Sequence, residues 1–230
     1  MSTVRDAGPA ESSRRLHVRL WTWFIVSTLL LVLLSGALPV TRNAALRAAA
    51  RLLVTPQRSV HSADVIVVAI DAQGAGTLEA ADLVHEGIAS RVAVFDDPPT
   101  ASDREFIRRG LPYDDRAAIS VTQLHLLGVP NVERVPRYTS GSEQEGLLLP
   151  GWCIQRGYRS LVLVTSTDHS RRLARIMRRA TRDRGITVVV LASRYSNFDP
   201  DRWWTTRYGA RTEIIEFEKL LLDVVRHPFS

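Results

Sequence analysis

The sequence predicts an α/β domain with a doubly wound, mostly parallel sheet, preceded by one N-terminal transmembrane helix. Continuous apolar runs of strand length, such as ADVIVVAI at 63–70, are typical of parallel strands that are covered on both faces. Helical patterns alternate with these runs along the chain, as they do when helices cover both faces of a sheet. An uncharged, mainly apolar stretch of 21 residues, 20–40, lies ahead of them.

The N-terminal part divides into three predicted segments. Residues 1–19 form a polar tail that we expect to be disordered. Residues 20–40 are long enough for a membrane anchor, which needs about 20 apolar residues as a helix. Trp21 and Trp23 stand at one end of this segment, where aromatic rings favour the headgroup level. A cleaved signal peptide, with the small residues 35–37 at its cleavage site, is the competing interpretation. Residues 41–62 then form a juxtamembrane helix and linker, with Pro56 stopping the helix.

The positive charge of the chain belongs to the region around this apolar stretch. Residues 1–63 hold eight arginines and two acidic residues, which accounts for the whole net charge of +6, whereas 64–230 is neutral. This distribution favours a membrane surface and argues against a nucleic-acid partner. Four arginines precede the apolar stretch and four come after it, so charge does not orient it. N-terminal segments of this design usually direct the rest of the chain across the membrane, and we therefore expect a single-pass inner-membrane protein with an extracytoplasmic α/β domain.

The α/β domain at 63–230 is predicted element by element. Strands are expected at 63–70, 90–96, 132–135, 160–166 and 186–193, and helices at 76–87, 114–128, 142–157, 169–185 and 211–227. Pro150 is expected to kink or break the third of these helices. The alternation indicates a Rossmann-like arrangement with helices on both faces of the sheet.

Polar residues gather where the predicted strands end, and ligands of such sheets bind outside those ends. The first strand ends in Asp71, the second in Asp96 and Asp97, and the fourth in the run Thr165–Asp168 followed by His169. A helix begins at that last tip, so its free backbone N–H groups favour an anion. Asp168 or Ser166 could also cap that helix.

Several familiar motifs are missing from the sequence. The glycines of DAQGAG, 71–76, do not form GxGxxG and favour a plain tight turn. No G-x-S-x-G, Walker or HExxH motif is present. The lone Cys153 excludes an intrachain disulfide and a cysteine-built metal site, and its apolar neighbours predict a buried role. The sequence identifies no cofactor and no metal, although a metal-assisted site using Asp71 and Asp96 is conceivable.

The helix at 169–185 separates into two faces. Leu173, Ile176, Met177 and Ala180 form the apolar one. The opposite stripe of five arginines is expected to be solvated: Arg171, Arg175, Arg178, Arg179 and Arg182. Arg172 lies one turn into the helix beside the strand tip, where its guanidinium could bind a phosphate or carboxylate bidentately.

These residues carry a resemblance to a known family. The stretch LVLVTSTDHSRRLARI, 161–176, resembles the signature of the YdcF/SanA/ElyC-like proteins, in which a strand leads to Thr-Ser, a His and then an Arg; His169 and Arg172 match. SGSEQEG, 140–146, resembles the segment leading to a glutamate at a helix start, matched by Glu145. The closing elements of the family are matched by Trp203, Arg211, Glu216 and Lys219.

The sequence also departs from the family. The first strand ends AIDAQGAG and the second VFDDPP, where members usually carry Gly-Gly pairs, and the usual arginine at the start of the first helix is missing around Thr77. Two loops of the implied pocket therefore carry acidic residues where family members have glycine. A ligand could still bind there, although not in the usual way of the family.

The resemblance implies a membrane-anchored protein of the bacterial envelope, linked to peptidoglycan and its lipid carrier. In this interpretation His169, Glu145 and Asp168 are the candidate catalytic residues, and Glu145 orients His169 or meets a hydroxyl. The candidate ligand-binding residues are Arg172, Ser166, Thr165, Asp71 and Arg211. The leading hypothesis is a factor that binds or processes a phosphate-bearing, lipid-linked wall precursor. A Rossmann-like enzyme with a nucleotide-type ligand and a non-catalytic membrane scaffold are the alternatives, and the oligomeric state stays open.

Overall fold

A computed structural model describes residues 38–56, 59–113, 115–137 and 141–230, together with Trp21, Trp23 and Ser27. The chain separates into two units, Met1–Ala48 and Ala49–Ser230. The predicted tail at 1–19 lies outside the described residues, as does most of the predicted anchor at 20–40. Among the residues that are described, no helix is long and apolar enough to cross a membrane. Helix α2 spans Pro39–Arg51 and confirms a helix in the predicted juxtamembrane segment.

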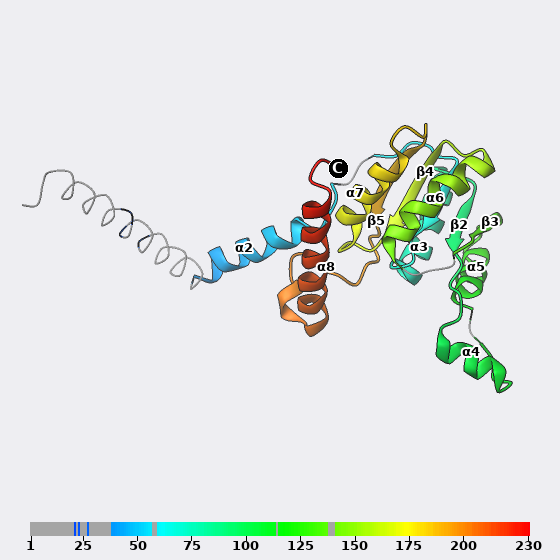
Figure 1. Cartoon of the computed structure of the whole chain (residues 1–230), viewed down its shortest axis with the longest axis horizontal. Coiled ribbons are helices and arrows are strands. Elements are labelled where there is room, and N and C mark those ends of the chain that lie inside the picture. The colour runs from blue at the N-terminus through cyan, green and yellow to red at the C-terminus, as the bar shows by residue number, and fades with distance from the viewer. Residues whose placement is uncertain are drawn as a thin grey trace, which may run out of the picture. The chain divides into compact units, whose positions relative to one another are not determined.

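The second unit is built on a parallel sheet of five strands, which confirms the predicted α/β class (Figure 1). The strands are β1 (Val65–Val68), β2 (Val92–Phe95), β3 (Val132–Val135), β4 (Ser160–Thr165) and β5 (Thr187–Ala192). Their order is β3-β2-β1-β4-β5, and every neighbouring pair is parallel. The chain therefore builds outward from β1 in one direction, crosses back, and builds outward in the other. The switch between the two directions falls between β1 and β4, where a crevice is expected.

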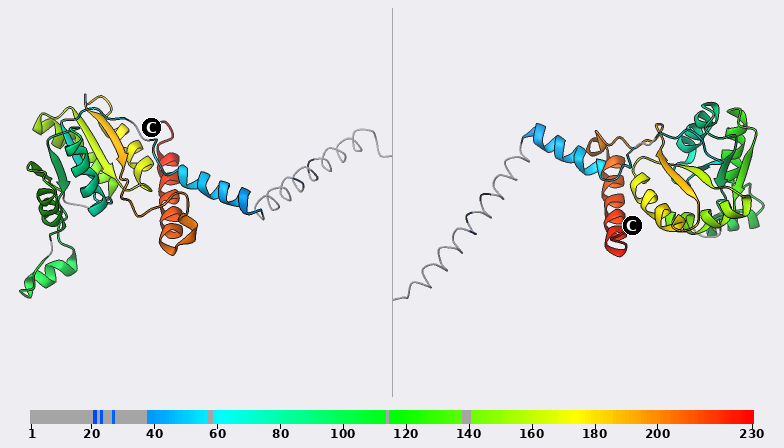
Figure 2. Two further views of the ribbon diagram at one scale, coloured as in Figure 1. Left: turned by 180° about the vertical axis from the view of Figure 1, so that it is seen from behind. Right: turned by 90° about the horizontal axis from the view of Figure 1, so that it is seen from above.

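Helices cover both faces of the sheet, as predicted (Figure 2). On one face, alternate residues of β1, β2 and β4 pack against α3 (Gln73–His85) and α5 (Arg116–Leu126). On the other face, α6 (Ser142–Arg156) and α7 (Ser170–Thr181) bury a second apolar cluster that includes Cys153, which confirms the buried role predicted for this residue. Helix α4 (Ala101–Arg108) has no buried residue, and α8 (Arg207–Arg226) comes after the short helix η1 (Trp203–Thr205).

Three local features differ from the sequence-based expectation. Helix α6 continues through Pro150, because Leu149 and Trp152 are buried and Gly146 packs closely on Ile176 of α7. The expected break at Pro150 does not occur. Helix α4 was not predicted, and it begins with a capping box in which Thr100 and Asp103 bond reciprocally. In the DAQGAG segment only Asp71 and Ala72 lie in a turn, because Gln73–Gly76 form the start of α3, with Gly76 pressed against β1.

The chain ahead of β1 is docked onto the domain rather than serving as a free linker. Ala50 and Leu53 are fully buried, so the compact unit begins before residue 63. The Arg171 backbone N–H donates to the Leu53 carbonyl at 2.9 Å, and the Thr55 N–H donates to Ser170 Oγ at 2.9 Å. The Arg171 guanidinium also donates to the Val54 carbonyl at 2.8 Å. The Leu53 carbonyl therefore accepts one of the free N–H groups in the first turn of α7.

Helix α8 packs on α7 through charged groups. Asp223 accepts from Arg175 Nε at 2.6 Å and from Arg179 Nη2 at 2.5 Å, and all three side chains are largely buried. Arg175 also donates to the carbonyls of His227 and Ser230. We call these contacts, together with the Arg172–Glu216 ion pair, the α7–α8 seam. The prediction of a solvated arginine stripe is therefore wrong for Arg175 and Arg179, because the acidic face of α8 covers them.

Candidate functional site

Two cavities open at the carboxyl ends of the strands, on either side of β1. The β1–β2 cavity has a volume of about 430 Å³ and the β1–β4 cavity a volume of about 630 Å³. Both volumes lie in the range of small-molecule sites. The two cavities share four lining residues: Ile70, Gln73, Asp97 and Arg116. They therefore adjoin one another along the crevice that the strand order creates.

Asp71 connects the tips of β1 and β4 at the base of the crevice. Its Oδ2 accepts from Thr165 Oγ1 at 2.7 Å, from the Ser166 N–H at 2.9 Å and from Ser166 Oγ at 2.6 Å. Its other oxygen, Oδ1, is buried and has no hydrogen-bond partner. Asp71 lines the β1–β4 cavity, whereas Thr165 and Ser166 do not. These two residues thus hold Asp71 in place and leave one of its buried oxygens without a partner.

Glu145 supplies a second carboxyl group to the same cavity, from the first turn of α6. Its side chain is buried, and Oε2 has no hydrogen-bond partner. Burial raises the pKa of Glu145 to about 8, and the nearby Asp71 charge adds to the effect, against a hydrogen bond from the Ile70 backbone. At neutral pH Glu145 is therefore mainly protonated and can donate a proton. Contrary to the expectation that it orients His169, no hydrogen bond joins these two described residues.

His169 is held between carboxylates on both sides of its ring. Nδ1 lies 2.6 Å from Asp168 Oδ2, and Nε2 lies 3.1 Å from Glu216 Oε1. Burial alone would lower the pKa of His169, but the hydrogen bonds to Asp168 and Glu216 outweigh it and raise the pKa to about 10. His169 is thus an imidazolium at neutral pH. It can donate a hydrogen bond or stabilise negative charge, and it is poorly suited to act as a general base.

Arg172 and Glu216 form a buried ion pair next to His169. Arg172 donates to Glu216 Oε2 from Nε at 3.1 Å and from Nη2 at 3.0 Å. Lys219 Nζ donates to the other oxygen, Oε1, at 2.6 Å. Burial alone would raise the pKa of Glu216, but His169, Arg172 and Lys219 together lower it to about 2. An external anion at Arg172 would therefore have to compete with an internal carboxylate.

The remaining predicted residues have different positions. Asp168 lies behind His169, and its Oδ1 is buried without a partner. Neither Asp168 nor Ser166 caps α7, whose N-cap residue is His169 with no side-chain cap bond. Because the Leu53 carbonyl accepts the Arg171 N–H, the expected anion site at this helix start is partly covered by the chain itself. Arg211 is exposed and lines neither cavity, so the structure does not bring it to the other predicted residues.

Two glutamates of α8 were not predicted as site residues. Glu216 enters the sequence analysis only as part of the closing E-x-x-K pattern, yet it contacts His169, Arg172 and Lys219. Glu213 is buried, and neither of its carboxyl oxygens has a hydrogen-bond partner. Burial raises its pKa to about 7, and the Asp168 charge adds to this. The 3-residue spacing of these acids, continued by Asp223 seven residues after Glu216, was the available signal for a polar face turned inward.

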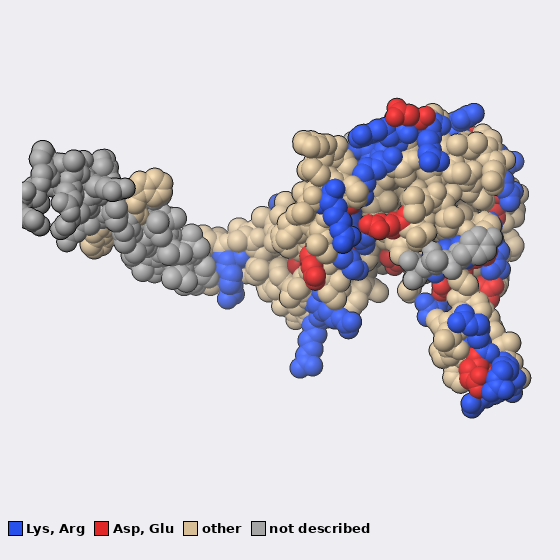
Figure 3. Space-filling view, in the orientation of Figure 1, with Lys and Arg blue, Asp and Glu red and all other residues tan. Residues whose placement is uncertain are grey.

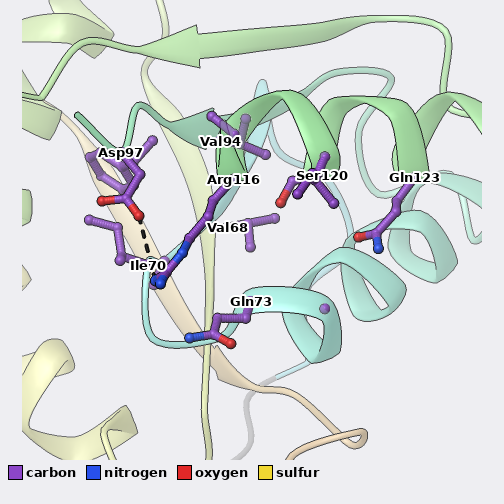
Figure 4. Close-up of a pocket in the computed structure, with 13 residues that line it drawn as sticks. Val68, Ile70, Gln73, Val94, Asp97, Arg116, Ser120 and Gln123 are labelled. Carbon is purple, nitrogen blue, oxygen red and sulfur yellow. Dashed lines mark ion pairs between the residues drawn. The ribbon is translucent and has the colours of Figure 1, made fainter. Parts of the chain in front are cut away.

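The β1–β2 cavity has a different character, with an apolar floor and polar side chains around it (Figure 4). Val68, Ile70 and Val94 line the sheet side, and Arg116 extends across the opening towards Asp97, 3.7 Å away. Gln73 begins α3 with φ of 43°, a left-handed conformation that is unusual for a residue with a side chain. Such conformations are concentrated at ligand sites.

The two aspartates at the end of β2 bind different arginines. Asp96 is bound by Arg134 of β3, and Asp97 is bound by Arg137 Nη2 at 2.6 Å. Within the described residues, no group of three or more His, Cys, Asp or Glu side chains is arranged to hold a metal ion. The side chains of Asp71 and Asp96 are each engaged by their own partners, so the geometry gives no support to a shared metal.

No protein-family model matches this chain, and no curated protein matches it.

Proposed function

We propose that this chain is a membrane-anchored protein of the bacterial envelope, of the YdcF/SanA/ElyC-like family, that binds or processes a phosphate-bearing, lipid-linked cell-wall precursor. One observation carries the site: two carboxyl groups with unpartnered buried oxygens, Asp71 and Glu145, line a single cavity. Buried polar atoms without partners are rare and costly, and a ligand that satisfies them gains affinity. Hydroxyl groups are the ligand donors that fit two free carboxyl oxygens.

The charges around the cavity extend this proposal to an anionic ligand. Arg116, Lys219 and Arg226 line the same cavity and are exposed. Arg116 and Lys219 have acidic partners at its edge, whereas Arg226 forms no ion pair within the described residues. These cations suit a phosphate at the mouth, with sugar or polyol hydroxyls deeper at Asp71. Glu145 would then donate its proton to a leaving oxygen, or hydrogen-bond to a ligand oxygen in a purely binding role.

The site is tested with Asp71→Asn and Glu145→Gln in the full-length chain. Each variant keeps the side-chain volume, and Glu105→Gln, in an exposed carboxyl of α4 outside both cavities, is the matched control. Asp71→Asn should weaken binding of a phosphate-bearing lipid precursor by about 10- to 100-fold, since hydrogen bonds to a charged group contribute about 1.5–3 kcal/mol. Unchanged binding and full complementation of a deletion strain by the double variant would favour the non-catalytic scaffold.

The side of the membrane is tested with a reporter. A phosphatase that is active only outside the cytoplasm is fused after Ser230. We expect an active fusion, since the precursor with its sugar groups is processed on the outer side of the membrane. An inactive but expressed fusion would contradict the proposed location and turn the search to cytoplasmic ligands.

A nucleotide-type ligand is the second candidate, and the β1–β2 cavity favours it. The strand order is that of dinucleotide-binding sheets, and Asp97 at the end of β2 lies where an acidic residue meets a ribose hydroxyl. The absence of a GxGxxG segment weighs against it. Titration of the full-length chain with adenine nucleotides, monitored by calorimetry, distinguishes this candidate, because saturable binding that is lost in Asp97→Asn would support it.

A further inference from the structure

Helix α8 presents its acidic residues to the protein and its apolar residues to the outside. Its buried positions are Gly209, Glu213, Glu216, Leu220 and Asp223. Its exposed apolar side chains include Ile214 at 64%, Phe217 at 43%, Leu221 at 54% and Val225 at 70%. These positions repeat every three to four residues, so they form one continuous stripe along the helix. We call this set, with the adjoining Leu222 and Val224, the α8 apolar stripe.

Two buried acidic residues of α8 have charged partners, whereas its exposed apolar residues are uncovered in the described part of the chain. The buried acids Glu216 and Asp223 are neutralised by Arg172, Arg175 and Arg179 of α7. The outer stripe has no apolar cover within the described residues. Single exposed apolar residues are ordinary on protein surfaces, but a contiguous stripe of large ones marks an interaction surface.

The charges beside the stripe indicate what covers it. The exposed charged residues of α8 are almost all basic: Arg207, Arg211, Lys219 and Arg226, against Glu218. Figure 3 shows a mostly tan surface over α8, with blue side chains beside it and a smaller red area on it. If two copies of the chain packed stripe to stripe, these cations would face one another. An apolar stripe flanked by basic residues instead matches the interface of an anionic lipid bilayer.

Aromatic residues lie near both ends of the same helix. Tyr208 is 57% exposed in its first turn, and Phe229 is 93% exposed just beyond its end. A tyrosine ring favours the level of the lipid headgroups, and phenylalanine is typical of the apolar side of interfacial helices. The composition of the surface therefore agrees with its charge in selecting a bilayer as the partner.

We propose that α8 lies on an anionic lipid bilayer, with its apolar stripe at the boundary between headgroups and acyl chains. The inference rests on the proposed function for the presence of a membrane beside the domain. It adds that α8 is a second, peripheral contact. Because Lys219, Leu222 and Arg226 of α8 also line the β1–β4 cavity, this contact would place the cavity mouth at the bilayer surface. A lipid-linked ligand could then enter without leaving the membrane.

The test uses the full-length chain reconstituted in vesicles of phosphatidylglycerol and phosphatidylcholine. An environment-sensitive fluorophore is attached at Leu221→Cys, and quenching by lipids that carry brominated acyl chains is measured. The native Cys153 is buried, so it does not take the label. The matched control is Leu126→Cys on α5, a leucine that is 83% exposed and far from α8 in the sequence.

We expect severalfold stronger quenching at position 221 than at position 126, and weaker quenching at 221 when the anionic lipid is omitted. Equal quenching at the two positions, in a chain that still floats with the vesicles, would overturn the inference while leaving the proposed anchor intact. A chain that does not float at all would instead overturn the proposed membrane function together with it. Disulfide-linked dimers of unlabelled Leu221→Cys, formed in high yield, would assign the stripe to a second copy and also overturn the inference.

Discussion

Helix α3 and helix α8 are both held on the same domain, but by opposite kinds of contact. Helix α3 meets the sheet through small apolar residues: a Cβ on Gly76 would lie 2.7 Å from Val68 Cγ1. Helix α8 meets α7 through carboxylates and guanidinium groups, with Asp223 and Glu216 at the centre of the seam. Its large apolar side chains point away from the domain.

The difference separates a contact made by close-packed apolar side chains from a contact made by buried charges beside the candidate site. Apolar contacts of the α3 kind are close-packed and have no strong dependence on pH. The seam depends on charges that were taken out of water, and these are stable only as long as every partner is present. Arg172 belongs to both the seam and the β1–β4 cavity, and His169, which also contacts Glu216, lines the same cavity. The stability of α8 and the electrostatics of the candidate site are therefore coupled.

The largest effect is expected from breaking the seam with Glu216→Ala. This change leaves His169, Arg172 and Lys219 without their shared partner. Removing one member of a buried ion pair costs about 3–5 kcal/mol, and we expect a loss of unfolding free energy in this range. Chemical unfolding of the full-length chain in detergent micelles measures it, with Glu216→Gln as the control that keeps the shape. A loss below about 1 kcal/mol, which is typical of exposed pairs, would contradict a buried seam.

A smaller effect is expected at the apolar contact of α3. In Gly76→Ala the new Cβ would meet Val68 Cγ1 of β1 at 2.7 Å, so the helix has to shift away from β1. Overpacking of this kind costs about 1–3 kcal/mol. Gly74 is in the same helix, and a Cβ added there would have no heavy atom within 4 Å, so Gly74→Ala should stabilise by up to about 1 kcal/mol. Thermal unfolding of the two variants should give shifts of opposite sign, and equal shifts would sink this account of α3 packing.

The last effect depends on pH and is expected at Glu145. Its pKa of about 8 in the folded chain exceeds the ordinary value of 4.5, so the folded state keeps a proton that the unfolded state releases. Stability therefore falls as pH rises from 4.5 to about 8, by up to about 1.4 kcal/mol per pH unit from this group. Glu145→Gln removes this dependence. The stability of the variant relative to the unmodified chain should increase between pH 5 and pH 8, and a constant difference would show that Glu145 is ionised in the folded state.

The apolar half of this comparison could be predicted from the sequence. The runs at 63–70 and 160–166 are typical of buried strands, and their alternation with helices predicts the parallel sheet. The charged contacts between α7 and α8 could not be predicted from the sequence. The arginines of α7 and the acids of α8 each look like a solvated face when their helix is considered alone. Only the tertiary contact brings Arg175 to Asp223, 48 residues away in the sequence.

The candidate site shows the same division. The rule that ligands bind at strand ends selected Asp71 and His169, and the family resemblance selected Glu145; all three line one cavity. Periodicity could not show that Thr165 and Ser166 donate hydrogen bonds to Asp71. It also could not show that Arg172 forms an ion pair with Glu216, since these contacts join side chains from different elements. Arg211 was selected on resemblance, and it lies on the exposed side of α8, beside the apolar stripe.

The docking of 50–55 onto α7 has a mechanical consequence. Leu53 and Thr55 are bonded to Arg171 and Ser170 in the first turn of that helix. A pull on the N-terminal end of the chain is therefore transmitted first to this turn, before it reaches any strand of the sheet. His169 is the residue that immediately precedes it. A force applied to the chain ahead of residue 50 would thus reach the histidine end of the crevice before the sheet.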